Sequence, residues 1–234
     1  MVALVLVSVK SNVWYRRLFN KLFTSNNYYK SMQAMFFLTF LYGVTPFRIV
    51  TTDCGDKRLS SSSFGYLNAL LHVSVMAFCY AYTIHYNESV VGYFLSNNIS
   101  NLGNKLYVLS GVIGATVIFI SAVVRKKILV KCVNLFLKID ERFKVIGQTV
   151  DYTTILRFVL LVLSSVALLD CTLTIICVYC LKSMDASPSP CLVVIVVGEC
   201  FGISLSISLF CSMTRSIQRR MQLLNQVRKW MIFS

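Results

Sequence analysis

Four long apolar stretches, almost free of charged residues, constrain the fold of this 234-residue chain more than any other feature. They cover residues 64–86, 106–124, 155–181 and 191–213, and each contains at least 19 residues. A helix rises 1.5 Å per residue, so each stretch reaches roughly the 30 Å depth of a bilayer's hydrocarbon core. No water is available there for backbone hydrogen bonds, so each stretch must be helical. The sequence therefore predicts an all-α fold, a polytopic transmembrane helix bundle with four spans.

A fifth apolar run, residues 33–47, is shorter and is interrupted by Gly43 and Pro46. As a helix it would reach only about 22 Å, which is less than the hydrocarbon core. It could be a tilted span, or a segment that dips into the membrane and returns.

The distribution of positive charge favours the second interpretation. If the short run does not span, the predicted interior pieces hold 8, 8 and 5 of the 23 Lys and Arg residues, in 1–63, 125–157 and 214–234. Only Lys105 and Lys182 then fall in the exterior loops 87–105 and 182–190. If it does span, a basic segment must lie outside, against the positive-inside rule. We therefore expect a cytoplasmic N-terminus and a cytoplasmic C-terminus.

Two glycosylation sequons agree with this topology. Asn87-Glu-Ser and Asn98-Ile-Ser both fall in the loop that the charge count places outside. The sequence thus predicts a multi-pass glycoprotein of the plasma membrane. Its parts would be a cytoplasmic region 1–63, a four-helix transmembrane region 64–213 and a basic cytoplasmic segment 214–234.

The N-terminal region carries a further membrane signal. In residues 10–32, Lys and Arg alternate with aromatic and apolar residues at helical spacing, as in a helix that lies in the headgroup layer. An exposed cytosolic tail is an equally good interpretation. The apolar run Val2–Val9 lacks a preceding basic stretch and a cleavage site, so it does not resemble a signal peptide.

Charge and cysteine content exclude other classes of protein. The excess of 23 basic over 9 acidic residues flanks apolar runs, so lipid headgroups, and not nucleic acid, are the expected partner. Most of the nine cysteines lie inside apolar runs and are expected to act as small hydrophobic residues. Cys180 and Cys191 flank one short loop and could form a disulfide if that loop is extracellular.

Three segments, taken in order, resemble a known family. They are Gly43-Val-Thr-Pro-Phe-Arg48 before the first span, Phe136–Phe143 with Asp140 after the second, and the Arg-rich Thr214–Asn225 after the fourth. This pattern is similar to the insect gustatory receptors, seven-helix chemoreceptors with a cytoplasmic N-terminus. The resemblance implies small-molecule tastants as ligands, bound in the outer half of the bundle. It also implies homo- or hetero-tetrameric ligand-gated cation channels whose seventh helix lines the pore.

The chain departs from the family at its C-terminal end. The family's Thr-Tyr and Gln-Phe motif in the seventh helix has no match among these residues, and neither do the fifth to seventh spans. The sequence thus resembles the N-terminal four-sevenths of a receptor, as a fragment would. We expect these 234 residues not to conduct ions by themselves. The alternative is a complete tetraspan scaffold or channel accessory protein.

Two acids inside predicted spans are the first candidate ligand contacts. Asp170 and Glu199 lie at a similar depth, about 12–17 Å below the outer surface. A carboxylate at the bilayer centre costs at least about 2.5 kcal/mol, so each should face a cavity or a partner. The two could line one polar pocket. Alternatively, each is protonated or bonded to a backbone carbonyl or to a hydroxyl group such as those of Ser164, Thr174 and Ser204.

Tyr82 and His85, near the outer end of the first span, are the second pair of candidates. With Tyr86 they also fit an interfacial aromatic belt. His72 lies deeper and is expected to be a hydrogen-bonded core residue. No phosphate-binding loop, metal-spaced histidine cluster or Gly-x-Ser-x-Gly motif occurs, so the sequence predicts no enzyme, no cofactor and no metal site.

Overall fold

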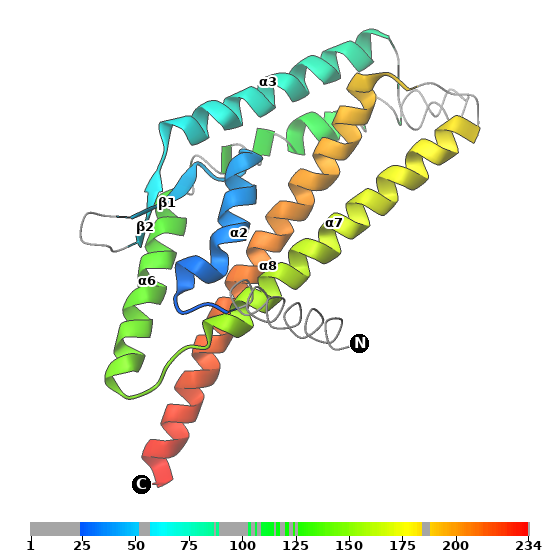
Figure 1. Cartoon of the computed structure of the whole chain (residues 1–234). Helices are drawn as coiled ribbons and strands as arrows, with labels where there is room; N and C mark the ends of the chain where they lie inside the picture. Colours follow the sequence, from blue (N-terminus) through cyan, green and yellow to red (C-terminus); the bar gives the residue numbers. More distant parts are fainter. Residues whose placement is uncertain are drawn as a thin grey trace, which may run out of the picture.

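A computed structural model shows a bundle of helices with a two-stranded hairpin at one side (Figure 1). It describes residues 24–51, 57–86, 88, 103, 106, 109–114, 116–117, 120–121, 124, 126–183 and 188–233. The elements are α2 (Tyr28–Leu41), β1 (Phe47–Thr51), β2 (Lys57–Ser61), α3 (Ser63–His85), α6 (Lys126–Val145), α7 (Tyr152–Ser183) and α8 (Pro190–Phe233).

Long apolar helices dominate the described part of the chain. Three of them, α3, α7 and residues 190–229 of α8, are long and apolar enough to cross a membrane. The predicted all-α membrane helix bundle is confirmed. The predicted span 106–124 lies only partly within the described residues, and those described in it are helical.

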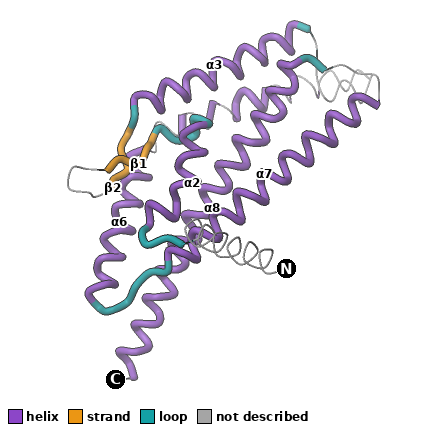
Figure 2. The backbone as a smooth tube through the Cα atoms, in the orientation of Figure 1, coloured by secondary structure: helices purple, strands orange, loops and turns teal. Residues whose placement is uncertain are grey.

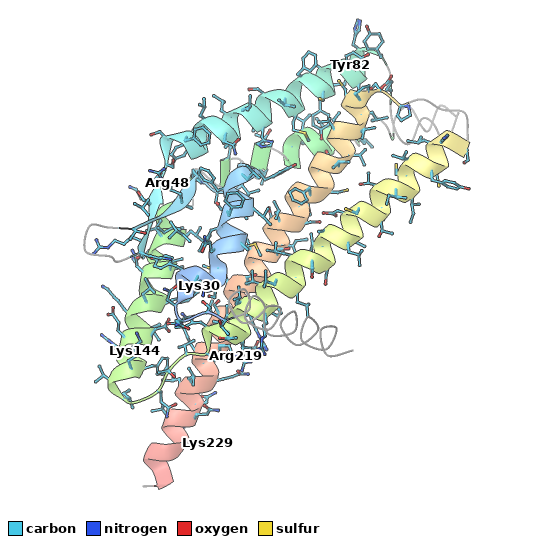
Figure 3. All side chains as sticks on the ribbon, in the orientation of Figure 1. Lys30, Arg48, Tyr82, Lys144, Arg219 and Lys229 are labelled. Carbon is cyan, nitrogen blue, oxygen red and sulfur yellow. The ribbon has the colours of Figure 1, made fainter. Side chains whose placement is uncertain are left out.

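Helix α8 continues far beyond the predicted end of the fourth span at residue 213. It runs without a break to Phe233, so the basic segment 214–234 is largely the continuation of the same helix (Figure 2). Charged residues such as Arg219 end an apolar run but not a helix, because Arg and Gln are good helix formers. Figure 3 shows Lys144, Arg219 and Lys229 at the opposite end of the molecule from Tyr82.

Helix α7 leaves most of its apolar surface uncovered by the rest of the chain. Leu168 is 71% exposed and Ile175 is 68% exposed. A soluble monomer rarely exposes an apolar patch of this extent to water. In a membrane, lipid or another helix covers such a patch, so no apolar surface is exposed to water. This exposure agrees with the membrane placement of α7.

The short apolar run forms an interior helix. Helix α2 has 14 residues, which corresponds to about 21 Å, and it packs against α7, α8, β1 and α3. Asn27 starts it, because its Oδ1 accepts a hydrogen bond from the Lys30 N–H at 2.8 Å. Whether α2 dips into a membrane, as the charge count predicts, stays a prediction.

The hairpin was not expected from the sequence. Strands β1 and β2 pair antiparallel, with Phe47 opposite Ser61 and Thr51 opposite Lys57. Phe47 and Leu59 turn inward and join the main core. That core lies where α2, α6 and the first turns of α7 meet, and its largest fully buried side chains include Tyr28, Phe36 and Ile155.

A tight turn after α2 brings its end against α3. Gly43 has φ +79°, a left-handed conformation that terminates the helix. The last carbonyls of α2 are capped from α3, because Asn68 Nδ2 donates to the Phe40 and Leu41 oxygens at 2.9 and 2.6 Å. His72 Nε2 also donates to the Leu41 oxygen, at 3.2 Å. His72 is therefore hydrogen-bonded, as predicted, but it is half-buried and belongs to neither core cluster of the described residues.

Replacing Gly43 by alanine should destabilise the fold by about 2–4 kcal/mol. The new Cβ would combine left-handed strain with a contact 2.7 Å from the Ala69 Cα, a backbone atom that cannot move freely. Gly147→Ala is the matched control, because Gly147 has φ +77° but nothing lies within 4 Å of its added Cβ. Chemical unfolding in detergent measures the difference, and equal losses for the two variants would show that the contact with α3 is unimportant.

Candidate functional site

An apolar cavity of about 310 Å³ lies between the end of α2, the first half of α3, residues 110–114 and the N-terminal part of α8. Most of its walls come from aliphatic side chains and glycines, including Val73, Met76 and Ile203. Few polar side chains reach it. A volume of this size accommodates a small organic molecule.

Glu199 is the acidic group of this cavity. It lies on α8, and its Oε1 accepts a hydrogen bond from the hydroxyl of Tyr80, a buried residue of α3. The neighbouring residue, Gly198, accepts a hydrogen bond from the Tyr42 hydroxyl through its carbonyl oxygen. Both tyrosines therefore connect α8 to the other walls. Neither could be singled out from the sequence, because apolar helices contain many tyrosines.

Aromatic rings form one side of the cavity. The rings of Tyr42 and His72 line it, with their centroids 5.0 Å apart, and Phe201, which is not among the lining residues, packs against the Tyr42 ring at 5.2 Å. These contacts fix the orientation of Tyr42. The cavity thus holds one carboxyl group together with the aromatic rings of Tyr42 and His72 in a mostly apolar lining, a combination that can recognise an organic cation.

Glycines make the room for these contacts. An added Cβ at Gly111 would collide with both Glu199 and the Tyr80 hydroxyl, so the backbone at Gly111 lies directly against this pair. At Gly202 an added Cβ would come within 3.0 Å of the Tyr42 ring. Small residues allow such close helix approach in membranes.

Asp170 lies apart from the cavity. Its Oδ1 accepts a hydrogen bond from the Ser204 hydroxyl at 3.1 Å, while its buried Oδ2 has no hydrogen-bond partner among the residues that the structure describes. Helices α7 and α8 pack together, but Asp170 does not line the space that Glu199 lines. The structure therefore gives the two acids different surroundings.

The other predicted contacts lie at the far end of α3. The Tyr82 and Tyr86 rings are 4.5 Å apart, and the His85 and Tyr86 rings are 5.0 Å apart. The three rings lie together, but they do not line the cavity. Such a cluster at the end of a membrane helix is typical of an interfacial aromatic belt. The sequons at Asn87 and Asn98 lie outside the described residues.

The thiols add no further chemistry in the described part of the chain. Cys180 and Cys191 are both free, and Cys191 lies against Cys79 of α3 instead. Within the same residues, no group of three His, Cys, Asp or Glu side chains could hold a metal ion.

A buried ion pair joins three helices at the opposite end of the bundle. Arg220 of α8 donates to both carboxylate oxygens of Asp140 on α6, at 2.9 and 2.6 Å. The Tyr152 hydroxyl of α7 donates to Asp140 Oδ2 at 2.8 Å. Both charged residues are 4% exposed. The second and third segments of the family resemblance thus meet in one contact.

Aromatic rings enclose this pair. The Arg220 guanidinium carbon lies 4.4 Å from the centre of the Phe136 ring and 5.3 Å from that of Tyr28. Burial raises the pKa of Tyr28, so its hydroxyl stays protonated and donates to Met213 Sδ at 3.2 Å. The sequence gives one indication of this cluster. Asp140 lies on the apolar face of α6 between Phe136 and Phe143, and an acid at such a position needs a buried partner.

Asp151, just before α7, should make stability depend on pH. It accepts hydrogen bonds from the Thr154 hydroxyl and from the Thr153 N–H, the latter at 3.0 Å. The Thr154 hydroxyl is the largest cause that holds the pKa of Asp151 below its ordinary value. The stabilisation is therefore complete above the unfolded pKa and is lost as pH falls through the lower folded pKa.

Asp151→Asn should remove this dependence while keeping an acceptor at the helix start. In a pH series from 6 to 3, the wild-type chain should lose about 0.5–1 kcal/mol more unfolding free energy below pH 4 than the variant, a small effect because the side chain is exposed. Parallel pH curves for the two proteins would contradict this role.

Over residues 32–231 the chain matches the family described as 7tm Chemosensory receptor. It is 31% identical to "Putative gustatory receptor 28b" of Drosophila melanogaster, over 92% of this chain and 46% of the relative. It is 24% identical to "Putative gustatory receptor 28a" of the same organism, over 90% of this chain and 46% of the relative. The chain therefore spans about half the length of these curated relatives. Their family is one of receptors, not of enzymes.

Proposed function

Because this chain belongs to the 7tm chemosensory receptor family and its relatives are insect gustatory receptors, we propose that it is a gustatory-receptor subunit that recognises small-molecule tastants. The membrane helix bundle supports this function, and so does the cavity, whose walls all lie within the matched residues 32–231. The cavity between α2, α3 and α8 is the ligand-binding part.

The observation that carries this proposal is the position of Glu199. A carboxyl group in an apolar cavity of about 310 Å³, close to aromatic rings, selects an apolar molecule with a positive charge or a strong hydrogen-bond donor. The remaining lining is apolar and binds the body of such a ligand by shape and burial.

Two rigid probes of nearly equal size test this selection. 1-Adamantanamine carries an ammonium group at neutral pH, and 1-adamantanol carries a hydroxyl group on the same apolar cage. We expect the purified chain in nanodiscs to bind the amine at least about tenfold more tightly than the alcohol. Equal affinities, or no saturable binding of either, would contradict a cation-selective cavity.

We assign channel activity only to a tetramer of complete receptor subunits, not to residues 1–234 alone. The family resemblance supports a homo- or hetero-tetrameric cation channel, with the pore formed by the family's seventh helix. Since residues 1–234 contain no segment similar to that helix, we expect residues 1–234 in a planar bilayer to give no ligand-gated current. Cation currents from this chain by itself would contradict the expectation.

The proposed location is the plasma membrane, with residues 1–63 and 214–234 in the cytoplasm. The positive-inside distribution supports this orientation. Glycan mapping in a glycosylating cell should find modification at Asn87 or Asn98. An N-terminal glycosylation tag that is modified instead would show the opposite orientation.

A further inference from the structure

A basic groove lies between the β1–β2 hairpin and helix α6. Its volume is about 640 Å³, twice that of the cavity at Glu199. Ser60 and Ser61 of β2 form one wall, and Lys127, Lys131 and Lys138 of α6 form the other. The groove therefore carries three ammonium groups on the wall that faces the hairpin.

The three lysines share one face of α6. They are four and seven residues apart, which places them in a row on a helix, and Asn134 lies between them on the same face. All three are exposed, and none forms an ion pair within the described part of the chain. Their charges are thus available to an anion that enters the groove.

The floor of the groove is apolar. Phe47 and Leu59 from the hairpin and Val130 and Leu135 from α6 line it, and Leu135 is 55% exposed. An ion such as free phosphate gains nothing from such a floor, whereas a lipid brings glycerol and acyl groups that it can cover.

The groove also lies at a membrane boundary. Ser61 comes two residues before the start of α3 at Ser63, and Lys127 comes three residues after the predicted span 106–124. Both walls therefore begin where apolar spans end, on the side that the charge count predicts to be cytoplasmic. That leaflet is the one that carries anionic lipids.

We propose that this groove binds the phosphorylated headgroup of an anionic phospholipid. Lys127, Lys131 and Lys138 neutralise the phosphates, Asn134 donates a hydrogen bond, and the apolar floor covers the glycerol region. Basic pockets next to membrane helices commonly hold such headgroups. The site is separate from the proposed tastant cavity, and neither depends on the other.

Native mass spectrometry of the detergent-purified chain tests the site with three probes. These are short-chain phosphatidylinositol 4,5-bisphosphate, short-chain phosphatidylcholine and soluble inositol 1,4,5-trisphosphate. We expect one phosphoinositide bound per chain, no retained phosphatidylcholine and at least about tenfold weaker binding of the soluble headgroup. Equal affinity for the soluble headgroup would overturn the lipid assignment in favour of a free-phosphate site.

Three triple variants test the location. K127Q/K131Q/K138Q should weaken phosphoinositide binding at least about tenfold, whereas K127R/K131R/K138R should retain it. K30Q/R228Q/K229Q removes the same number of exposed charges elsewhere and should bind like the wild type. Circular dichroism checks that all variants stay helical. Unchanged binding by the first variant, or equal loss in the third, would overturn the proposal.

Discussion

Replacing Arg220 by leucine should lower the free energy of unfolding by about 3–5 kcal/mol. The substitution leaves Asp140, which is 4% exposed, as a buried carboxylate without its bidentate partner. It also removes the cation from between the Phe136 and Tyr28 rings. For a chain of this length the thermal midpoint should fall by roughly 6–20 °C, measured in detergent.

Two further variants separate the ion pair from general effects of the substitution. Asp140→Leu combined with Arg220→Leu removes both charges and should recover much of the loss, because no unpaired buried charge remains. Arg228→Leu is the matched control on the same helix, since Arg228 is exposed, and should change stability by less than about 0.5 kcal/mol. A loss for Arg220→Leu as small as that of the control would show that the pair does not hold α6 to α8.

Glu199→Gln should weaken binding of 1-adamantanamine about 10- to 100-fold. The glutamine keeps an oxygen that can accept the Tyr80 hydrogen bond, so the cavity keeps its shape while its negative charge is lost. A hydrogen bond to a charged group contributes about 1.5–3 kcal/mol, which corresponds to this change in affinity. Binding of 1-adamantanol should change less than about threefold, as measured by isothermal titration in nanodiscs.

Asp170→Asn is the control for this prediction. Asp170 is the other acid within the spans, but it bonds to Ser204 and does not line the cavity. Its substitution should leave the affinity for the amine unchanged. If Asp170→Asn weakens the amine as much as Glu199→Gln does, the charge acts at long range and the cavity is not the site.

The membrane helices could be predicted because the hydropathy of each residue in a long apolar run adds to the same conclusion. Some 20 apolar residues in a row specify a buried or lipid-facing helix whatever their neighbours are. The β1–β2 hairpin has no comparable signal, because each strand has only five residues and neither Phe47–Thr51 nor Lys57–Ser61 alternates strictly between apolar and polar residues, as a half-buried strand should. The sequence did not show that α8 continues unbroken past residue 213, because a change in polarity marks the end of a membrane span, not the end of a helix.

Individual contacts could be predicted only where a charged residue occurs within an apolar segment and therefore needs a polar partner. Glu199 could be found because an acid in an apolar span needs a partner. Its partner Tyr80 could not, because the rotation of α3 about its axis depends on packing. Asp140 and Arg220 are 80 residues apart, and only the fold shows that they meet.

Photoaffinity labelling with an aminoadamantane diazirine tests the central claim most directly, namely that the cavity beside Glu199 binds the ligand. Labelled residues would be located by peptide mass spectrometry, with 1-adamantanamine as competitor. The account predicts competed labels on α3 around residues 69–76 and on α8 around residues 198–203, and their loss in Glu199→Gln. Competed labels confined to the exposed face of α7, with these two segments unlabelled, would contradict it.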